Sequence, residues 1–275
     1  MATTTAPLPK PVARTPRPLR VILIVVVFVY AVFAVGTSAL NLIDLAARHE
    51  FTTHASYRGV RAIVVSNSLG DVHLVSAPAG APVSVRTHVT ERLRTPHRSV
   101  SRGPGGTLKL SASCSNSIAD ASCDVGFTVA VPPGVHLRGA GSSGGDIEAR
   151  GLVSRTPLDI GSSGGDIDLE GVTAPSLYLH SSDGDVTATG ARASIVSATS
   201  GEGDVRVALT APPREVSVRS SEGDVHLTVP DVVYALNAAS SDGDVFDRDV
   251  RQDPHSPRTI KARSNEGDVR ISVRR

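Results

Sequence analysis

The sequence has few large aromatic side chains: among 275 residues there are no Trp, five Phe and four Tyr. Deep pockets for small molecules are usually lined by aromatic and large apolar residues, so this composition argues against such a pocket. The H-E-x-x-H motif of zinc peptidases is absent, and the nine histidines are scattered along the chain. We therefore expect a protein that is not an enzyme and that carries no cofactor.

An excess of charge of one sign is also missing. The chain has 28 Lys and Arg against 27 Asp and Glu, which gives a net charge of +1. Four of the basic residues lie within the first 20 positions, so the rest of the chain is slightly acidic. A nucleic-acid-binding domain normally shows a concentrated basic surface, and we expect no nucleic-acid partner.

Cysteine is rare, with Cys114 and Cys123 as the only two. Their spacing matches no common metal-binding or thioredoxin-type motif. A disulfide between them would be permitted outside the cytoplasm, and closing so short a loop contributes about 2–3 kcal/mol in the chain-entropy model. We expect a structural disulfide, with two free thiols or a redox pair as the alternatives.

One long apolar run lies near the N-terminus. Residues 1–20 are rich in Pro, Thr and Ala and contain no acid, which is typical of a disordered tail. Residues 21–43 carry no charge and are long enough to cross a membrane as a helix, since about 20 residues suffice. The positive-inside rule places residues 1–20 in the cytoplasm and the rest of the chain outside the cell membrane. A signal peptide cleaved near Thr37-Ser38-Ala39 is the alternative. We expect residues 44–57 to be a linker.

A short phrase of the form Ser-x-x-Gly-Asp-Val or Ser-x-x-Gly-Asp-Ile recurs through the second half of the chain. It begins at residues 142, 162, 181, 200, 220, 240 and 264, and a variant, Asn-Ser-Leu-Gly-Asp-Val, occupies 67–72. The spacing is 19 or 20 residues except for the last interval of 24. Fixed periods of this length indicate a stacked repeat architecture.

The residues around each phrase alternate between apolar and polar, as in Val216-Ser217-Val218-Arg219 before one corner and Val225-His226-Leu227 after it. This pattern predicts strands with one buried face. We expect glycine to supply a positive φ at each corner. No helical segment separates the strands, which excludes a βαβ sheet. The sequence predicts an all-β solenoid with coils of about 20 residues over 58–275, following the N-terminal transmembrane helix. Residues 58–141 would form an irregular cap and 142–275 the regular repeats.

The repeated Ser-x-x-Gly-Asp-Val corners, the Val-Pro-Pro-Gly-Val-His-Leu segment at 131–137 and the preceding apolar run resemble the bacterial putative-adhesin domains, also called toast-rack domains. The resemblance covers about residues 58–275. It implies a β-helical domain facing the cell envelope, without established catalysis. Relatives are associated with adhesion or with envelope-stress systems. This chain departs from its own later repeats at 142–147 and 162–167, where Gly replaces the first acidic residue.

From the third regular corner onward, two carboxylates flank each glycine. Stacking of equivalent positions predicts two acidic stripes, which could bind divalent cations or serve only as solvated turn residues. The ten residues are Asp183, Asp185, Glu202, Asp204, Glu222, Asp224, Asp242, Asp244, Glu266 and Asp268. The repeated Ser has no paired base, and identical acids on every coil are not the arrangement of a hydrolase cleft.

The expected function is therefore that of a membrane-anchored, extracytoplasmic binding or adhesion module whose partner is an envelope protein or polysaccharide. A sensor or scaffold subunit of an envelope-stress complex is the alternative. A polysaccharide-active β-helix enzyme is a remote third reading.

Overall fold

A computed structural model describes Tyr30 and residues 49–68, 70–91, 96–113 and 124–274. The chain divides into two compact units, Met1–Arg48 and His49–Arg275, and the fold below is that of the second. Among the described residues, no helix is long and apolar enough to cross a membrane. Apart from Tyr30, the transmembrane helix predicted over 21–43 lies outside the described residues, as do residues 1–20 and both cysteines.

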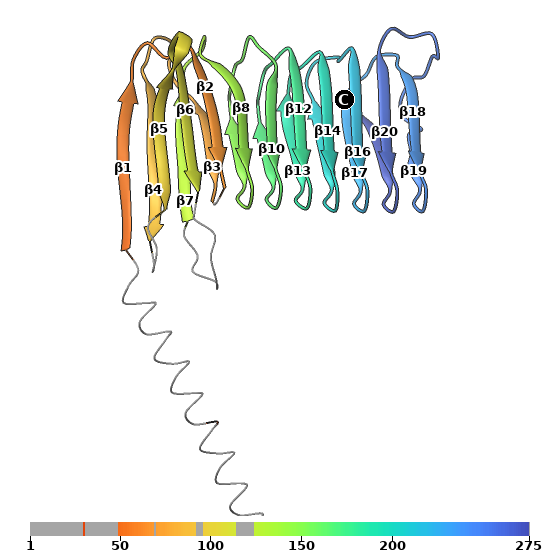
Figure 1. Cartoon of the computed structure of the whole chain (residues 1–275). Coiled ribbons are helices and arrows are strands. Elements are labelled where there is room, and N and C mark those ends of the chain that lie inside the picture. The colour runs from red at the N-terminus through yellow and green to blue at the C-terminus, as the bar shows by residue number, and fades with distance from the viewer. Residues whose placement is uncertain (1–29, 31–48, 69, 92–95, 114–123, 275) are drawn as a thin grey trace, which may run out of the picture. The chain divides into compact units, whose positions relative to one another are not determined.

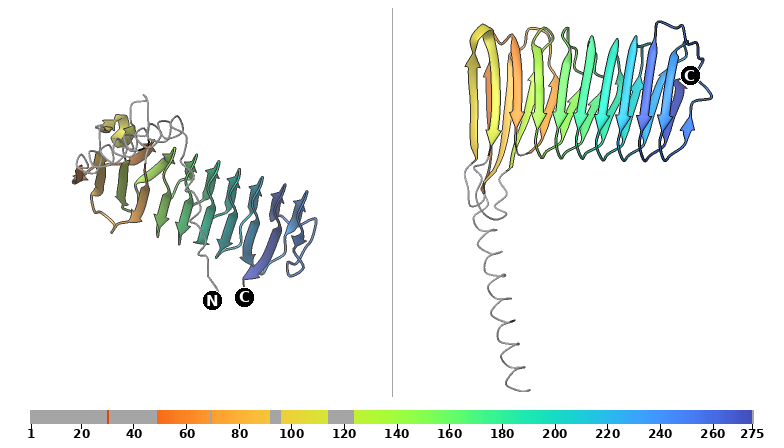
Figure 2. Two further views of the ribbon diagram at one scale, coloured as in Figure 1. Left: turned by 90° about the horizontal axis from the view of Figure 1, so that it is seen from below. Right: turned by 45° about the vertical axis from the view of Figure 1, so that its right-hand side comes forward.

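The second unit is built from two β-sheets that face each other (Figures 1 and 2). The first, sheet A, contains eleven strands. In spatial order they are β1 (His49–Tyr57), β4 (Val83–Glu91), β7 (Asp124–Val131), β3 (Val72–Ser76), β9 (Ile147–Arg150), β11 (Ile167–Glu170), β13 (Val186–Ala191), β15 (Val205–Leu209), β17 (Val225–Pro230), β21 (Val269–Arg274) and β19 (Val245–Phe246).

The second, sheet B, contains ten strands. Their spatial order is β5 (His97–Gly103), β6 (Thr107–Ser113), β2 (Ala62–Asn67), β8 (His136–Ser142), β10 (Leu158–Ser162), β12 (Ser176–Ser181), β14 (Ile195–Ser200), β16 (Glu215–Ser220), β20 (Thr259–Ser264) and β18 (Ala235–Ser240). A single 3₁₀ turn, Pro104–Gly106, joins β5 to β6.

Each coil consists of one strand of sheet B, a corner, and one strand of sheet A. Neighbouring coils pair in parallel, for example Leu158 with Leu177 in sheet B and Ile167 with Val186 in sheet A. Alternate residues point inward, and the core is formed almost wholly by Val, Leu, Ile and Ala, as in Val186, Ala188 and Leu179. Both sheets thus bury one face against the other, which confirms the predicted all-β solenoid and explains the alternation in the sequence.

The coils do not stack in the order of the sequence at the C-terminal end. Strand β21 pairs with β17 on one side and with β19 on the other, and β20 lies likewise between β16 and β18. The last coil in the sequence is therefore an interior coil, and the coil of β18 and β19 forms the end of the rack (Figure 1). The seven regular corners are therefore not stacked in the order of the sequence. The loop 247–258 makes the return possible because it carries the chain back past the end coil.

The N-terminal end shows the same kind of exchange. The coil of β2 and β3 lies between the later coil of β6 and β7 and the first regular coil of β8 and β9. Three strands, β5, β4 and β1, then close this end by antiparallel pairing. Arg98 lies 4.7 Å from the ring centroid of Phe51 and Arg102 lies 5.7 Å from that of Tyr57, so β1 and β5 contact across the end.

Residues 49–57 form strand β1 rather than part of a linker. The segment reads HEFTTHASY, and only Phe51, Ala55 and Tyr57 are partly shielded from solvent. An edge strand needs little apolar surface, and this polar composition gives a weak strand signal in the sequence. The remaining domain boundaries stay predictions.

Candidate functional site

The repeated Ser is the central residue of each corner. In every regular corner its hydroxyl oxygen accepts a hydrogen bond from the backbone N–H of the Gly three residues later, for example Gly184 to Ser181 at 3.0 Å. The same hydroxyl donates to a glycine carbonyl in the neighbouring coil, as Ser181 does to Gly165 at 2.9 Å. Ser181 is fully buried. Each Ser thus closes its own corner and ties that corner to the next coil.

The Asp that follows the glycine makes a second ladder. Except in the end coil, the carboxylate oxygen Oδ1 of each Asp accepts a hydrogen bond from the backbone N–H of the equivalent Asp in the next coil, at 2.7–3.0 Å. The ladder runs in the order Asp71, Asp146, Asp166, Asp185, Asp204, Asp224, Asp268 and Asp244. These carboxylates satisfy corner amides that point along the stacking axis.

The corner glycines are required by close stacking and not by a positive φ. Of the glycines that precede the ladder aspartates, only Gly70 has a positive φ, at 115°. A Cβ atom on Gly184 would lie 2.3 Å from the carbonyl oxygen of Gly165, and a Cβ atom on Gly203 would lie 2.5 Å from that of Gly184. The expectation of a positive φ therefore holds at Gly70 and is wrong at the seven regular corners. Glycine is required there because the corners approach each other more closely than a side chain allows.

The structure brings the second carboxylate of each predicted pair into this ladder, with the last two corners exchanged. It also adds Asp71, Asp146 and Asp166, which the prediction of ten carboxylates left out although they share the Gly-Asp signature. At the first corner Asn67 replaces Ser, and its amide nitrogen donates to the carbonyl oxygens of Gly70 and Val125. The 75-residue gap between Asp71 and Asp146 hid this adjacency from the sequence.

The first carboxylate of each pair has a different environment. Asp183, Glu202, Glu222, Asp242 and Glu266 are exposed to solvent. Within the part of the chain that the structure describes, no group of three or more His, Cys, Asp or Glu residues is placed to hold a metal ion. Cation binding by the ten carboxylates stays a prediction from the sequence.

A second acidic group lies on the outer face of sheet A. Asp168 lies beside Glu148 on the neighbouring strand, and Glu170 follows two residues later. Burial raises the pKa of the Asp168 carboxyl, and the charges of Glu148 and Glu170 raise it further against the opposing effect of Arg150. Arg150 bridges the group, with nitrogen–oxygen distances of 3.2 Å to Glu148 and 3.6 Å to Glu170. These groups lie on an exposed face and form no cleft.

Asp124 lies where the ladder meets the N-terminal coils. Burial raises the pKa of its carboxyl, and the nearby charge of Asp71 acts in the same direction. His88 and a hydrogen bond from the backbone of Val125 oppose the rise. This pair of carboxylates marks the point at which the corner ladder ends among the described residues.

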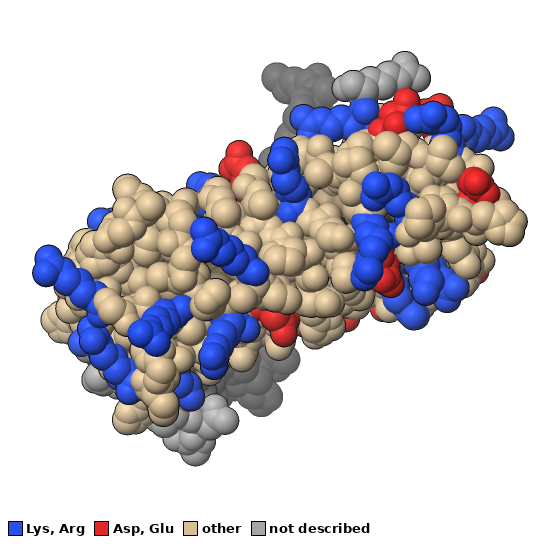
Figure 3. Space-filling view, turned by 90° about the horizontal axis from the view of Figure 1, so that it is seen from above, with Lys and Arg blue, Asp and Glu red and all other residues tan. Residues whose placement is uncertain are grey.

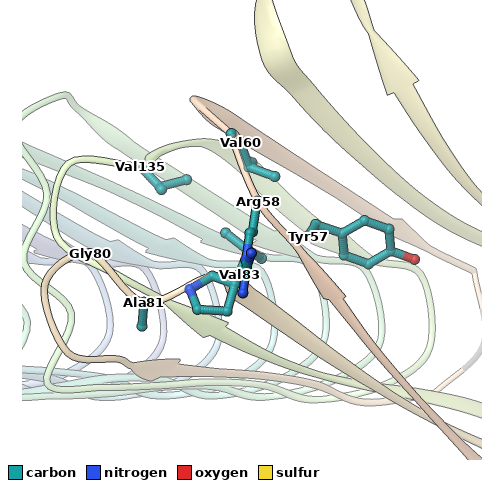
Figure 4. A pocket seen from close by; sticks show the side chains of 9 residues that line it. Tyr57, Arg58, Val60, Gly80, Ala81, Val83 and Val135 are labelled. Atoms are coloured by element: carbon teal, nitrogen blue, oxygen red, sulfur yellow. The ribbon is translucent and has the colours of Figure 1, made fainter.

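Hollows lie near both ends of the rack. At the N-terminal end, a pocket of about 230 Å³ is lined by residues including Arg58, Val60, Gly80 and Val135. Figure 4 shows the Tyr57 ring turned away from the Gly80–Ala81 loop. At the C-terminal end, a groove of about 620 Å³ runs beside Phe246, over whose ring Arg270 lies at 4.9 Å. The N-terminal pocket is lined by no acidic residue. The C-terminal groove is lined by Asp244, Asp249 and Ser272, and the Ser272 hydroxyl is hydrogen-bonded to the Thr228 hydroxyl at 3.0 Å rather than to a carboxylate or a His.

Two corners, Gly141–Gly145 and Gly161–Gly165, formally fit the pattern G-x-S-x-G. Their middle serines, Ser143 and Ser163, are exposed at a turn between two strands, without the following helix of a nucleophile elbow. No described His is hydrogen-bonded to either serine. These glycines and serines belong to the stacking geometry.

Comparison with known proteins gives one family. A model of the Toastrack DUF4097 family matches residues 134–275. Among curated protein sequences, none matches the chain. Solved structures similar to the chain include a putative adhesin from Bacteroides fragilis, with 17% identity and a TM-score of 0.43. A putative adhesin from Parabacteroides distasonis has 13% identity and a TM-score of 0.45. Each similarity covers 82% of this chain and 97% of the other.

Proposed function

The chain belongs to the Toastrack DUF4097 family, and we propose that it is a non-catalytic binding module anchored in a bacterial cell membrane by residues 21–43. The observation that supports this most strongly is that the repeated polar residues connect one coil to the next. Every repeated Ser and ladder Asp is engaged in a hydrogen bond between coils, so the most regular chemistry of the chain holds the rack together. What the rack offers a partner is its broad sheet faces and its edges.

The anchor is supported by the sequence. Residues 21–43 carry no charge, and Lys10, Arg14, Arg17 and Arg20 precede them. This arrangement places the N-terminus in the cytoplasm and the rack on the outer side of the membrane. A rigid rack on a single anchor would present its surfaces to envelope proteins or polysaccharides.

The location is tested by protease treatment of intact cells that produce the full chain with different epitope tags at its two ends. We expect the C-terminal tag to be lost from the membrane fraction while the N-terminal tag is protected. A matched variant, Val25→Arg with Val27→Arg, interrupts the apolar run and should abolish membrane retention. Protection of both tags in intact cells, with full degradation after lysis, would refute the external location.

The binding role is tested by co-sedimentation of the purified full chain with isolated cell-envelope fragments. We expect saturable binding that a variant lacking residues 2–20 retains, because the cytoplasmic tail is not part of the external surface. A sensor or scaffold subunit, the alternative from the sequence, would instead depend on that tail for its output. Absence of saturable binding would contradict the proposal.

A further inference from the structure

Positive charge gathers on two neighbouring strands of sheet B. Strand β16 and the residue before it carry Arg214 and Arg219, and β20 and the residue before it carry Arg258, Lys261 and Arg263. Glu215 is the one acidic residue in these two segments. We call these five cations the basic band.

The register places the band's cations in three rows. Arg214 and Arg258 precede the paired residues Glu215 and Thr259, Lys261 lies beside Ser217, and Arg219 lies beside Arg263. At about 3.3 Å per residue the rows span about 17 Å along the strands. Arg258 is held in place by hydrogen bonds from its guanidinium to the carbonyl oxygens of Pro212 and Pro213.

The pairing of Arg219 with Arg263 is unfavourable by itself, because like charges on directly adjacent strand positions destabilise a sheet. Within the described residues no ion pair neutralises Arg219, Lys261 or Arg263, and all three are exposed. The flanking strands β14 and β18 carry no charged residue. A shallow hollow of about 220 Å³ lies among Ser217, Arg219, Lys261 and Arg263.

The band continues onto the edge of the rack opposite the Gly-Asp corners. Figure 3 shows this edge, on which Lys and Arg predominate over Asp and Glu along much of its length. Exposed residues there include Arg155, Arg192 and Arg214. The edge that contains the Gly-Asp corners is acidic instead, since its repeated residues are Asp and Glu. The rack is thus polarised, with the basic band connected to the basic edge.

We propose that the basic band binds a linear polyanion carrying phosphate groups, which lies along the strands of sheet B. Arginine forks pair with phosphate oxygens in a bidentate manner, and the three rows match a ligand that presents charge repeatedly along its length. A single small anion reaches one row only. This inference rests on the proposed binding function and names the chemistry of its partner.

The test uses the purified full chain in a nonionic detergent and linear inorganic polyphosphate as the probe, with affinity measured by calorimetry. The variant Arg219→Thr, Lys261→Ser, Arg263→Thr introduces residues that occupy the same rows on neighbouring strands. We expect it to weaken binding roughly 10- to 100-fold, and Arg263→Thr alone roughly threefold. Binding by the wild type should weaken steeply with added salt.

The control Arg86→Thr, Lys109→Ser, Arg138→Thr removes three exposed positive charges from strands β4, β6 and β8, in the N-terminal half of the rack and away from the band. We expect it to bind polyphosphate within about threefold of the wild type.

An equal loss in the control, or no binding by the wild type, would overturn the proposal. Equally tight binding of inorganic phosphate would overturn the linear ligand, and equally tight binding of polyglutamate would overturn the phosphate chemistry. None of these results bears on membrane location, so failure here is distinguishable from failure of the proposed anchor.

Discussion

Asp204 accepts, through Oδ1, a hydrogen bond of 2.7 Å from the backbone N–H of Asp224 in the next coil. The same carboxylate forms an ion pair through Oδ2 with Arg206. The hydrogen bond between successive aspartates repeats along the rack, so each of these acidic residues acts mainly as a hydrogen-bond acceptor for the neighbouring corner. Its charge is secondary to that role.

The first prediction distinguishes the role of Asp204 as a hydrogen-bond acceptor from the effect of its charge. Asp204→Asn keeps an oxygen facing the Asp224 amide and should change the free energy of unfolding by less than about 0.5 kcal/mol, whereas Asp204→Ala leaves the amide unpaired and should cost about 1–2 kcal/mol. Chemical denaturation of the purified chain measures both. Arg206→Thr serves as the control for the exposed ion pair and should cost little. Equal destabilisation by Asn and Ala would show that the charge matters instead.

The second prediction concerns the close approach of the corners. Gly184→Ala places a methyl group 2.3 Å from the Gly165 carbonyl oxygen, which the stacked backbone cannot relieve without separating two coils. We expect a loss of at least about 2 kcal/mol in the free energy of unfolding. The matched control is Gly161→Ala, where the nearest atom, the carbonyl oxygen of His180, lies 3.5 Å from the added carbon. A similar cost at both positions would refute stacking as the reason for glycine.

The third prediction tests the exchanged order of the last coils. Ile260 is fully buried between Val216 and Leu236, while Leu236 lies on the end coil and is only partly buried. Ile260→Ala should therefore cost about 2–5 kcal/mol, and Leu236→Ala clearly less. Stacking in sequence order would place Leu236 inside and Ile260 at the end. A larger cost at Leu236 than at Ile260 in equilibrium unfolding would support that other order.

The fourth prediction concerns pH. Because folding raises the pKa of the Asp168 carboxyl, the folded chain holds this proton more tightly than the unfolded chain. Its contribution to stability is then most favourable below the ordinary Asp pKa and is lost as the pH rises through the raised pKa. Asp168→Asn should raise the melting temperature at neutral pH, by less than about 2 °C, and the gain should vanish in acid.

The control for this pH dependence is Asp159→Asn, which alters an exposed carboxyl on the outer face of sheet B. We expect its effect on the melting temperature to be small at neutral pH. A gain from Asp168→Asn that persists at pH values well below the ordinary Asp range would contradict the assignment.

Much of the rack follows from local patterns. The alternation around Val216 and Val225 predicts the paired strands, and the spacing of the serines predicts the coil length, because each coil repeats the same inward-facing positions. The order of the coils does not follow from these local patterns. The corners at 240 and 264 are equivalent in the sequence, and only the pairing of β21 with both β17 and β19 decides which is interior.

The candidate surfaces were less visible in the sequence. Lys261 and Arg219 are 42 positions apart, and they become neighbours because the last coil inserts beside β16. The net charge of the chain does not reveal this basic group, because the acidic corner residues balance it. The role of the corner glycines was similarly hidden, since the sequence cannot distinguish a glycine chosen for its φ from one chosen for close contact with another coil.

The central claim is that the repeated Ser-x-x-Gly-Asp corner is a stacking device, and calorimetric melting of the full chain in excess calcium or in EDTA tests it most directly. We predict equal melting temperatures in the two solutions, for the wild type and for the variant Asp204→Asn, Asp224→Asn, which keeps both acceptor oxygens. A calcium-dependent rise in the melting temperature that this variant abolishes would contradict the claim and make the acidic corners a cation site.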